Sequence, residues 1–211
     1  MEMSFHKNVK ENDKFNQYWY SKITVESIIK ELFSVAKSHS RVLNVAFLST
    51  PSLFFSVDSV WKGEVSEMPI NPVLFDFDKS LSKGVENRFQ FYDFQKPLNL
   101  PERLSKTFDC VVVDPPFITE EVWRCYAKTS EFLLRGSCKS ENSFIENNCG
   151  SSGLGLFIGT SIYENSALLE DLFGASCTKF LPSIPTLVYQ YNLFTNFDPL
   201  GPLASPNPEI S

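Results

Sequence analysis

The sequence has few glycines and histidines, and it lacks the motifs that bind phosphate groups. Nine glycines occur in 211 residues, and neither G-x-G-x-x-G nor G-x-x-x-x-G-K-[ST] is present. These absences argue against a dinucleotide site and against a P-loop. Two histidines and five cysteines without C-x-x-C spacing likewise argue against a zinc site or a disulfide framework. We therefore expect no bound metal.

Long apolar runs and an excess of positive charge are also missing. No stretch approaches the roughly 18 apolar residues of a membrane span, and the N-terminus is charged where a secretory signal would be apolar. The formal net charge of -6 argues against broad binding to nucleic-acid backbones. With 43% hydrophobic residues and 20 Phe, the composition is that of a globular protein. We expect a cytoplasmic protein.

Apolar segments of helical and strand periodicity alternate along the chain. Spacing of i, i+3, i+4 predicts a helix over 25–39, with Thr24 as its N-cap, and helices are also expected over 119–135 and 163–173. Strands are expected at 42–48, 73–78, 89–94, within 109–118, and at 154–160, 177–182 and 187–194. This alternation predicts an α/β fold with a seven-stranded, mostly parallel sheet whose last strand is antiparallel.

Composition shifts suggest how the chain is divided. Residues 1–16 are polar and are expected to be flexible, and 17–198 form a single domain. Within it, 136–153 are rich in Ser, Asn and Gly and are interpreted as a flexible insertion. Four prolines lie in 199–211, which we expect to be a disordered tail.

Acidic residues recur where the predicted strands end. Asp76 and Asp78 close the second strand, Asp93 closes the third and Asp114 the fourth. The carboxyl ends of parallel strands form the ligand-binding edge of such a sheet, and a carboxylate there can accept hydrogen bonds from both hydroxyls of a ribose. S-adenosylmethionine, a nucleoside without phosphates, needs no glycine-rich loop and fits this pattern.

The fourth strand ends in the tetrapeptide Asp114, Pro115, Pro116, Phe117. Proline has no N–H, so this segment offers a carboxylate and backbone carbonyls with few competing donors. Such acceptors can hold an amino group, and the Phe117 ring supplies an apolar wall beside it. The pattern is typical of transfer of a methyl group to nitrogen, in which alignment makes a large contribution to the rate. A purely structural role, with Asp114 capping the next helix, is the alternative for these four residues alone.

These residues carry a resemblance to a known family. D-P-P-F after an apolar strand is similar to the [DNS]-P-P-[YFW] motif of amino-methyltransferases. The segments 17-QYWYSKIT-24, 49-STPSLFF-55, 74-LFDFDKSL-81 and 189-YQYNLFTNFD-198 extend the likeness. Over about residues 15–198 the chain resembles the N6-adenine methyltransferase-like family assigned as lysine methyltransferases of translation elongation factor 1-alpha.

The resemblance implies a Rossmann-like, S-adenosylmethionine-dependent methyltransferase and a role for each site residue. Cofactor binding would fall to Trp19, Tyr20, Thr24, Ser49, Thr50, Pro51, Ser52, Asp76, Asp78, Asp93 and Asp114. Of these, Asp78, with Asp76, would hold the ribose and Asp93 the adenine amino group. Asp114, Pro115, Pro116 and Phe117 would form the catalytic acceptor site. The implied activity is lysine methylation of elongation factor 1-alpha by a protein expected to be a monomer.

Two alternatives remain open at this point. An N6-adenine methyltransferase acting on DNA or RNA could use Asp114 for the amino group and Phe117 for stacking, although the acidic composition disfavours it. A non-catalytic partner subunit with the same fold is the other, and the presence of Asp114 disfavours that. A lysine ammonium, with a pKa near about 10.4, must lose a proton before it attacks. The sequence leaves open whether Asp114 is a base or only orients the nitrogen.

Overall fold

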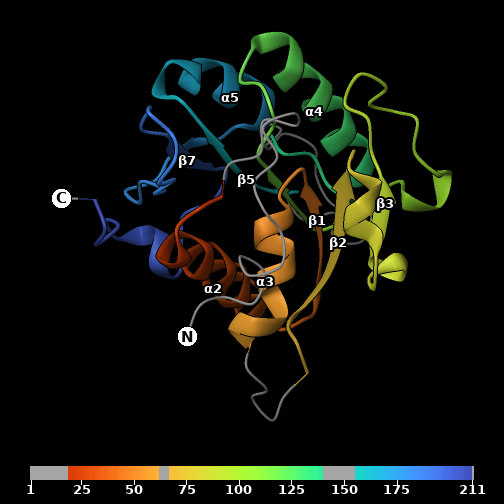
Figure 1. The fold of residues 1–211 in the computed structure, drawn as a ribbon, viewed down its shortest axis with the longest axis horizontal. Coiled ribbons are helices and arrows are strands. Elements are labelled where there is room, and N and C mark those ends of the chain that lie inside the picture. Colours follow the sequence, from red (N-terminus) through yellow and green to blue (C-terminus); the bar gives the residue numbers. More distant parts are fainter. Residues whose placement is uncertain (1–18, 62–66, 140–154, 211) are drawn as a thin grey trace, which may run out of the picture.

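One mixed sheet forms the centre of the molecule (Figure 1). The computed structural model describes residues 19–61, 67–139 and 155–210. The strands of this part are β1 (Leu43–Leu48), β2 (Ile70–Asp76), β3 (Phe89–Phe91), β4 (Cys110–Val113), β5 (Leu156–Ser161), β6 (Ser176–Cys177) and β7 (Asn192–Thr195). Their order is β3-β2-β1-β4-β5-β7-β6; β7 is antiparallel to both of its neighbours, β5 and β6, and the other paired strands of this sheet are parallel. The predicted Rossmann-like sheet, with its antiparallel last strand, is confirmed.

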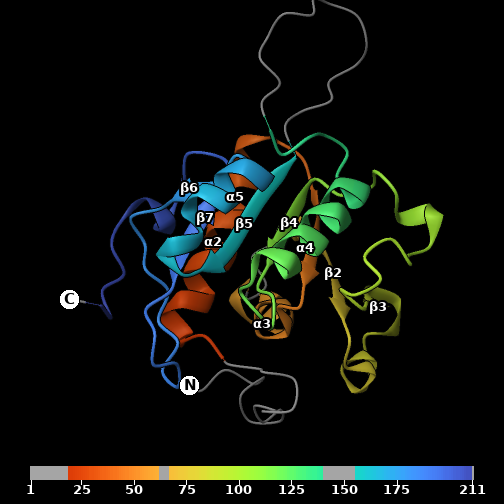
Figure 2. The ribbon, with the colours of Figure 1, turned by 90° about the horizontal axis from the view of Figure 1, so that it is seen from above.

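Helices cover both faces of the sheet. Helices α2 (Lys22–Ser38) and α3 (Pro51–Trp61) pack on one face, and α4 (Glu120–Leu133) and α5 (Ser166–Phe173) pack on the other (Figures 1 and 2). Along β1, Val45 and Phe47 belong to the first apolar cluster, whereas Ala46 and Leu48 belong to the second. This alternation follows from the two-residue period of a strand and explains why β1 is apolar on both faces from Val45 to Leu48.

Short 3-10 turns complete the secondary structure: η2 (Lys79–Ser82), η3 (Glu86–Arg88), η4 (Glu102–Leu104), η5 (Tyr163–Asn165) and η6 (Pro202–Ala204). In the described part of the chain, no helix has both the length and the apolar character needed to cross a bilayer.

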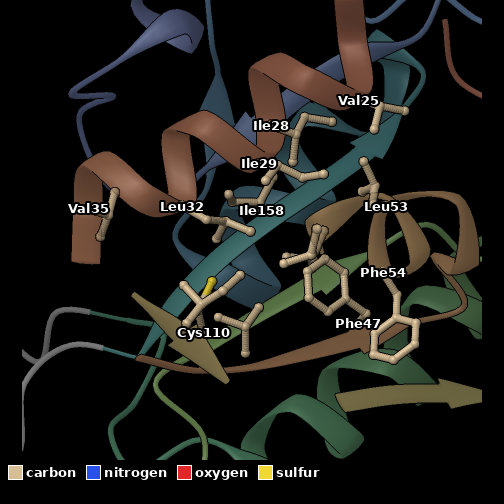
Figure 3. Close-up of a cluster of buried hydrophobic side chains, with 14 of the residues drawn as sticks. Val25, Ile28, Ile29, Leu32, Val35, Phe47, Leu53, Phe54, Cys110 and Ile158 are labelled. Carbon is tan, nitrogen blue, oxygen red and sulfur yellow. The ribbon is translucent and has the colours of Figure 1, made fainter. Parts of the chain in front are cut away.

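Helix α2 contributes much of the first core. Its apolar side chains point towards Phe47 of β1 and Ile158 of β5 (Figure 3). The helix begins earlier than predicted, because Ser21 and not Thr24 is the N-cap and its hydroxyl accepts a hydrogen bond from the Thr24 N–H at 3.2 Å. Thr24 therefore lies inside the first turn and is fully buried.

The last two strands are shorter than the apolar pattern predicts. Only Ser176–Cys177 and Asn192–Thr195 pair, and residues 178–191 between them form an irregular connection. Most of the backbone of this connection does not pair with the sheet edge. Its apolar residues instead cover the end of the sheet.

The prediction of a disordered tail at 199–211 is wrong for residues 199–210. This segment packs along α2, Leu203 is fully buried, and η6 forms within it. The reason is Glu31 of α2, a buried carboxylate that accepts backbone N–H groups of the segment.

The predicted insertion 136–153 is described only at its start, residues 136–139. Residues 140–153 of it, and the predicted flexible N-terminus 1–16, lie outside the described residues. Asn196 joins the two described sides of this segment, because its Nδ2 donates to the carbonyl oxygens of Cys138 at 2.9 Å and Gly155 at 2.7 Å. Both sides lie at the amino end of β5, opposite the carboxyl ends of the parallel strands.

Candidate active site

A cavity of about 250 Å³ lies at the carboxyl ends of the parallel strands. It opens beside the neighbouring strands β1 and β4. From this pair, later strands of the chain are added outward in opposite directions, and open α/β sheets bind ligands at such a switch point. The segments after β1 to β4 line it with Ser49, Thr50, Pro51, Ser52, Asp76, Phe77, Tyr92, Asp93, Phe94, Gln95, Asp114, Pro115, Pro116 and Phe117. Trp19, Tyr126, Ile184, Leu187 and Tyr191 complete the lining.

Asp114 is held in place by residues of β1 and β5 and by Tyr20, which precedes α2. Its N–H donates to the Leu48 carbonyl oxygen at 3.3 Å, and the Thr160 hydroxyl donates to its Oδ1 at 2.8 Å. The Tyr20 hydroxyl lies 2.6 Å from Thr160 Oγ1 and also hydrogen-bonds Asp114. Burial raises the pKa of Asp114 to about 6, while the two hydroxyls act in the opposite direction. The carboxyl group is thus fixed at the cavity wall and is ionised at neutral pH.

The rest of the D-P-P-F segment lines the same wall. Pro115 is buried, Pro116 is half-buried, and the Phe117 ring is 54% exposed. The ring meets the edge of Phe94 with centroids 6.5 Å apart. Because the prolines donate no hydrogen bonds, acceptors and an apolar surface dominate around Asp114. This environment suits an amino group.

The turn after β1 leads directly into α3. Ser49 adopts a left-handed conformation with φ of 56°, and its hydroxyl lies 2.7 Å from the Tyr126 hydroxyl of α4. Such a conformation is uncommon without glycine, and the bond to Tyr126 helps to hold it. Thr50 Oγ1 is buried at the cavity and has no hydrogen-bond partner among the described residues. Pro51 and Ser52 open α3, so a helix N-terminus favouring negative groups faces the cavity.

The two acids that close β2 have different surroundings. Asp76 is buried and lines the cavity, and its Oδ1 accepts the Asp78 N–H at 2.8 Å. Burial raises the pKa of Asp76 to about 6, and that backbone hydrogen bond lowers it in part. Asp78 does not line the cavity; its carboxylate caps η2 through the Ser80 N–H at 2.9 Å. The geometry therefore favours Asp76 over Asp78 as the ribose ligand.

Asp93 follows β3 and lines the cavity, as predicted. It is half-buried, and its Oδ1 accepts the Gln95 N–H at 3.0 Å. The neighbouring Phe94 ring stacks on Tyr126 with centroids 6.1 Å apart and planes 22° apart. This side of the cavity pairs a carboxylate with flat apolar surface, a combination suited to an aromatic base carrying an amino group.

The three N-terminal residues predicted for the cofactor lie in different places. Trp19 lines the cavity, whereas Tyr20 is buried behind Asp114. Thr24 does not line the cavity; its Oγ1 accepts the Ser183 N–H at 2.9 Å. The prediction that Thr24 closes over a cofactor does not agree with this position.

Several residues of the site were not predicted. Thr160 stands at the end of the predicted strand 154–160, so the rule that selected the acids at strand ends could have found it. Tyr126 lies on the buried face of α4. Ile184, Leu187 and Tyr191 come from the irregular connection 178–191, where strands were predicted at 177–182 and 187–194 and most of these residues do not pair with the sheet.

Charge decides which ligand the cavity can accept. The lining contains the carboxylic acids Asp76, Asp93 and Asp114 and, among the described residues, no Lys or Arg. Phosphate groups would be repelled, whereas a sulfonium or an ammonium ion would be attracted. The described residues also contain no cluster of His, Cys, Asp and Glu able to hold a metal ion. A ribose diol near Asp76 and a carboxylate near Thr50 and the α3 N-terminus would complete a fit to S-adenosylmethionine.

Comparison with known proteins is consistent with this chemistry. The profile of the family described as probable N6-adenine methyltransferase matches residues 11–199. A mouse (Mus musculus) protein named EEF1A lysine methyltransferase 1 is 29% identical over 192 residues, which cover 90% of this chain and 77% of that protein. The yeast (Saccharomyces cerevisiae) protein-lysine N-methyltransferase EFM5 is 31% identical over 124 residues, covering 57% of this chain and 46% of that protein.

Among solved structures, the E. cuniculi Mtq2-Trm112 complex, described as methylating the eRF1 translation termination factor, is similar with a TM-score of 0.43. The identity is 10%, over 85% of this chain and 97% of that one. A likeness this weak carries no argument.

Proposed function

Since the chain belongs to the family described as probable N6-adenine methyltransferases, we propose that it is an S-adenosylmethionine-dependent protein-lysine N-methyltransferase. The observation that supports this best is the cavity lined by Asp76, Asp93 and Asp114 with no basic side chain in the described lining. Both the methyl donor and a lysine side chain carry positive charge at the reacting end, so one acidic cavity suits both.

The cofactor would be held by residues at the ends of three strands and by Trp19, which precedes α2. Asp76 would accept the ribose hydroxyls and Asp93 the adenine amino group. Thr50 and the N-terminus of α3 would receive the carboxylate. Trp19 would lie against the bound molecule. When bound, S-adenosylmethionine supplies an electrophilic methyl group on a positively charged sulfur.

Asp114 would orient the lysine nitrogen. Its carboxylate is ionised at neutral pH because its pKa is about 6, and it would attract the incoming ammonium ion. The lost proton can pass to this carboxylate or to water, after which the remaining N–H groups of the amine donate hydrogen bonds to Asp114 and to the adjacent carbonyl of Pro115. The lone pair is then left to face the methyl group. Phe117 would exclude water from one side of the nitrogen, which favours the uncharged amine.

The substrate we propose is translation elongation factor 1-alpha, which the names of the mouse relative and its counterparts in cattle and humans specify. We also propose that the protein acts in the cytoplasm and as a monomer. Adenine in nucleic acid is the competing acceptor, as the family description implies, and Phe117 could stack on that base. The acidic lining disfavours it, since every adenine in a strand is flanked by phosphates.

A transfer assay with radiolabelled S-adenosylmethionine tests the proposal. The purified chain is offered elongation factor 1-alpha, RNA and DNA in parallel, and the modified residue is identified by mass spectrometry. We expect label on a lysine of the elongation factor, and its loss with Asp114→Ala. Asp171→Ala is the matched control, because Asp171 is an exposed acid on α5 that does not line the cavity. Label confined to RNA or DNA would refute the lysine proposal.

A further inference from the structure

We infer that the C-terminal segment, residues 200–210, positions the acceptor side of the cavity through Asn207 and Thr24. This inference rests on the proposed function for its kinetic readout and on the structure for its geometry. The family profile ends at residue 199, so the segment lies outside the matched region. Neither Asn207 nor Thr24 lines the cavity, and both would act through other residues.

Glu31 provides the first attachment of the segment. Its carboxylate is fully buried on α2 and accepts the N–H groups of Gly201 at 2.9 Å and Leu203 at 3.1 Å, together with that of Leu200. A Cβ at Gly201 would lie 2.8 Å from Ser34 Oγ, so the backbone approaches α2 as closely as glycine allows. This attachment fixes the path of the segment towards the N-terminus of α2.

Asn207 provides the second attachment, next to the start of α2. It is 2% exposed, and its Nδ2 donates to the Leu181 carbonyl oxygen at 2.8 Å. The same Nδ2 lies 3.4 Å from Thr24 Oγ1, and the Asn207 Oδ1 accepts the Glu209 N–H at 3.0 Å. Both the nitrogen and the oxygen of this buried side-chain amide form hydrogen bonds. Asn207 is therefore a specific link between the C-terminal segment, the start of α2 and the segment around Leu181.

Thr24 is the centre of this link. Its Oγ1 accepts the Ser183 N–H at 2.9 Å, and the Ser21 N–H donates to the Ser183 carbonyl oxygen at 2.8 Å. The start of α2 is thereby joined to residues 181–183, and the C-terminal segment closes the group through Asn207.

The two segments that Thr24 joins, the start of α2 and residues 181–183, are each adjacent in the chain to residues at the cavity. Tyr20 precedes Ser21, and its hydroxyl reaches Asp114 and Thr160. Ile184 follows Ser183 and lines the cavity, as Trp19 does. Loss of the Thr24 or Asn207 bonds should therefore loosen the Tyr20 hydroxyl from Asp114 and move the cavity wall at Ile184. Misplacement of a reacting group by about 1 Å can cost on the order of a hundredfold in rate.

The experiment uses isosteric and conservative variants of the full chain. Thr24→Val keeps the shape but loses the hydroxyl, Thr24→Ser keeps the hydroxyl, and Asn207→Ala removes the amide. Ser205→Ala is the control, because Ser205 is an exposed residue of the same segment. We expect Thr24→Val and Asn207→Ala to lower kcat by about tenfold or more. Thr24→Ser and Ser205→Ala should stay within twofold of wild type.

A second readout separates positioning from simple loss of stability. The Asp114 carboxyl is titrated by carbon-13 NMR in wild type, Thr24→Val and Asn207→Ala, all at a temperature well below unfolding. Because the Tyr20 hydrogen bond lowers the pKa of Asp114, its loosening should move the Asp114 titration to higher pH. Lower melting temperatures with unchanged kcat and unchanged titration would overturn the inference.

Failure of the proposed function can be told apart from failure of the inference. If wild type methylates none of the offered substrates, the proposed function fails and the titration alone decides the inference. A shift of the Asp114 titration in both variants, absent in Ser205→Ala, would still support it. An unmoved titration would refute it whatever the enzyme's activity.

Discussion

Asp76→Asn should stabilise the folded protein at neutral pH while weakening cofactor binding. Burial raises the pKa of Asp76 from 3.8 to about 6, so the folded state holds this proton more tightly than the unfolded state. Well below pH 3.8 both states are protonated and the carboxyl costs nothing. Between about pH 4 and pH 6 the unfolded state ionises while the folded state stays mostly protonated, so a penalty grows to roughly 3 kcal/mol, at about 1.4 kcal/mol for each pKa unit. The penalty is constant above the folded pKa of about 6. Asparagine cannot ionise and keeps the Oδ1 that accepts the Asp78 N–H.

Urea unfolding of wild type and Asp76→Asn at pH 4 and pH 7.5 measures this penalty. The variant should be more stable by about 2–3 kcal/mol at pH 7.5, and the two proteins should be nearly equal at pH 4. Calorimetry should show S-adenosylmethionine binding weakened about 10–100-fold, because one hydrogen bond to a charged group is lost. Asp171→Asn, at an exposed acid, should change neither quantity. A variant less stable at pH 7.5, or a difference equal at both pH values, would refute the reasoning.

Three further changes test other parts of the structure. Tyr20→Phe removes a hydroxyl that lowers the pKa of Asp114, so the acidic limb of the pH profile of methyl transfer should move upward from about pH 6; an unmoved limb would contradict the assignment. Gly159→Ala would place a Cβ 2.4 Å from the Phe157 ring, so urea unfolding should show that the free energy of unfolding falls by about 1–3 kcal/mol. A variant as stable as wild type would show instead that the ring can move away freely. Tyr189→Ser changes a ring that is 71% exposed and lies in the chain between the cavity-lining residues Leu187 and Tyr191. It should raise KM for elongation factor 1-alpha and leave S-adenosylmethionine affinity unchanged; a change in cofactor affinity alone would count against a substrate-facing role.

The sheet and much of the cavity follow from local sequence patterns. Apolar runs too short for helices marked the strands, and acids placed directly after them marked the ligand-binding edge. Asp93 and Asp114 line the cavity for this reason. The prediction works because parallel strands bring their carboxyl ends to one edge whatever lies between them.

The errors arise where long-range contacts decide the outcome. The chain leaves β2 at Asp76, two residues before the end of the apolar pattern, so the cavity contains Asp76 and not Asp78. Thr24 fits a cap by sequence, but Ser21 forms the cap and leaves Thr24 free to join distant segments. Prolines after residue 198 suggested disorder, but Glu31, far away in the sequence, supplies an acceptor that holds the tail.

Asn196 makes the region around residues 140–154 a useful position for protein engineering. Its amide holds Cys138 and Gly155 together, and the Gly155 N–H donates to the Ser137 carbonyl oxygen at 2.9 Å. The two ends are thus fixed to the sheet by the fold itself, at the edge opposite the cavity. A fluorescent protein or an affinity tag inserted between them would enter the chain at the edge of the sheet opposite the cavity.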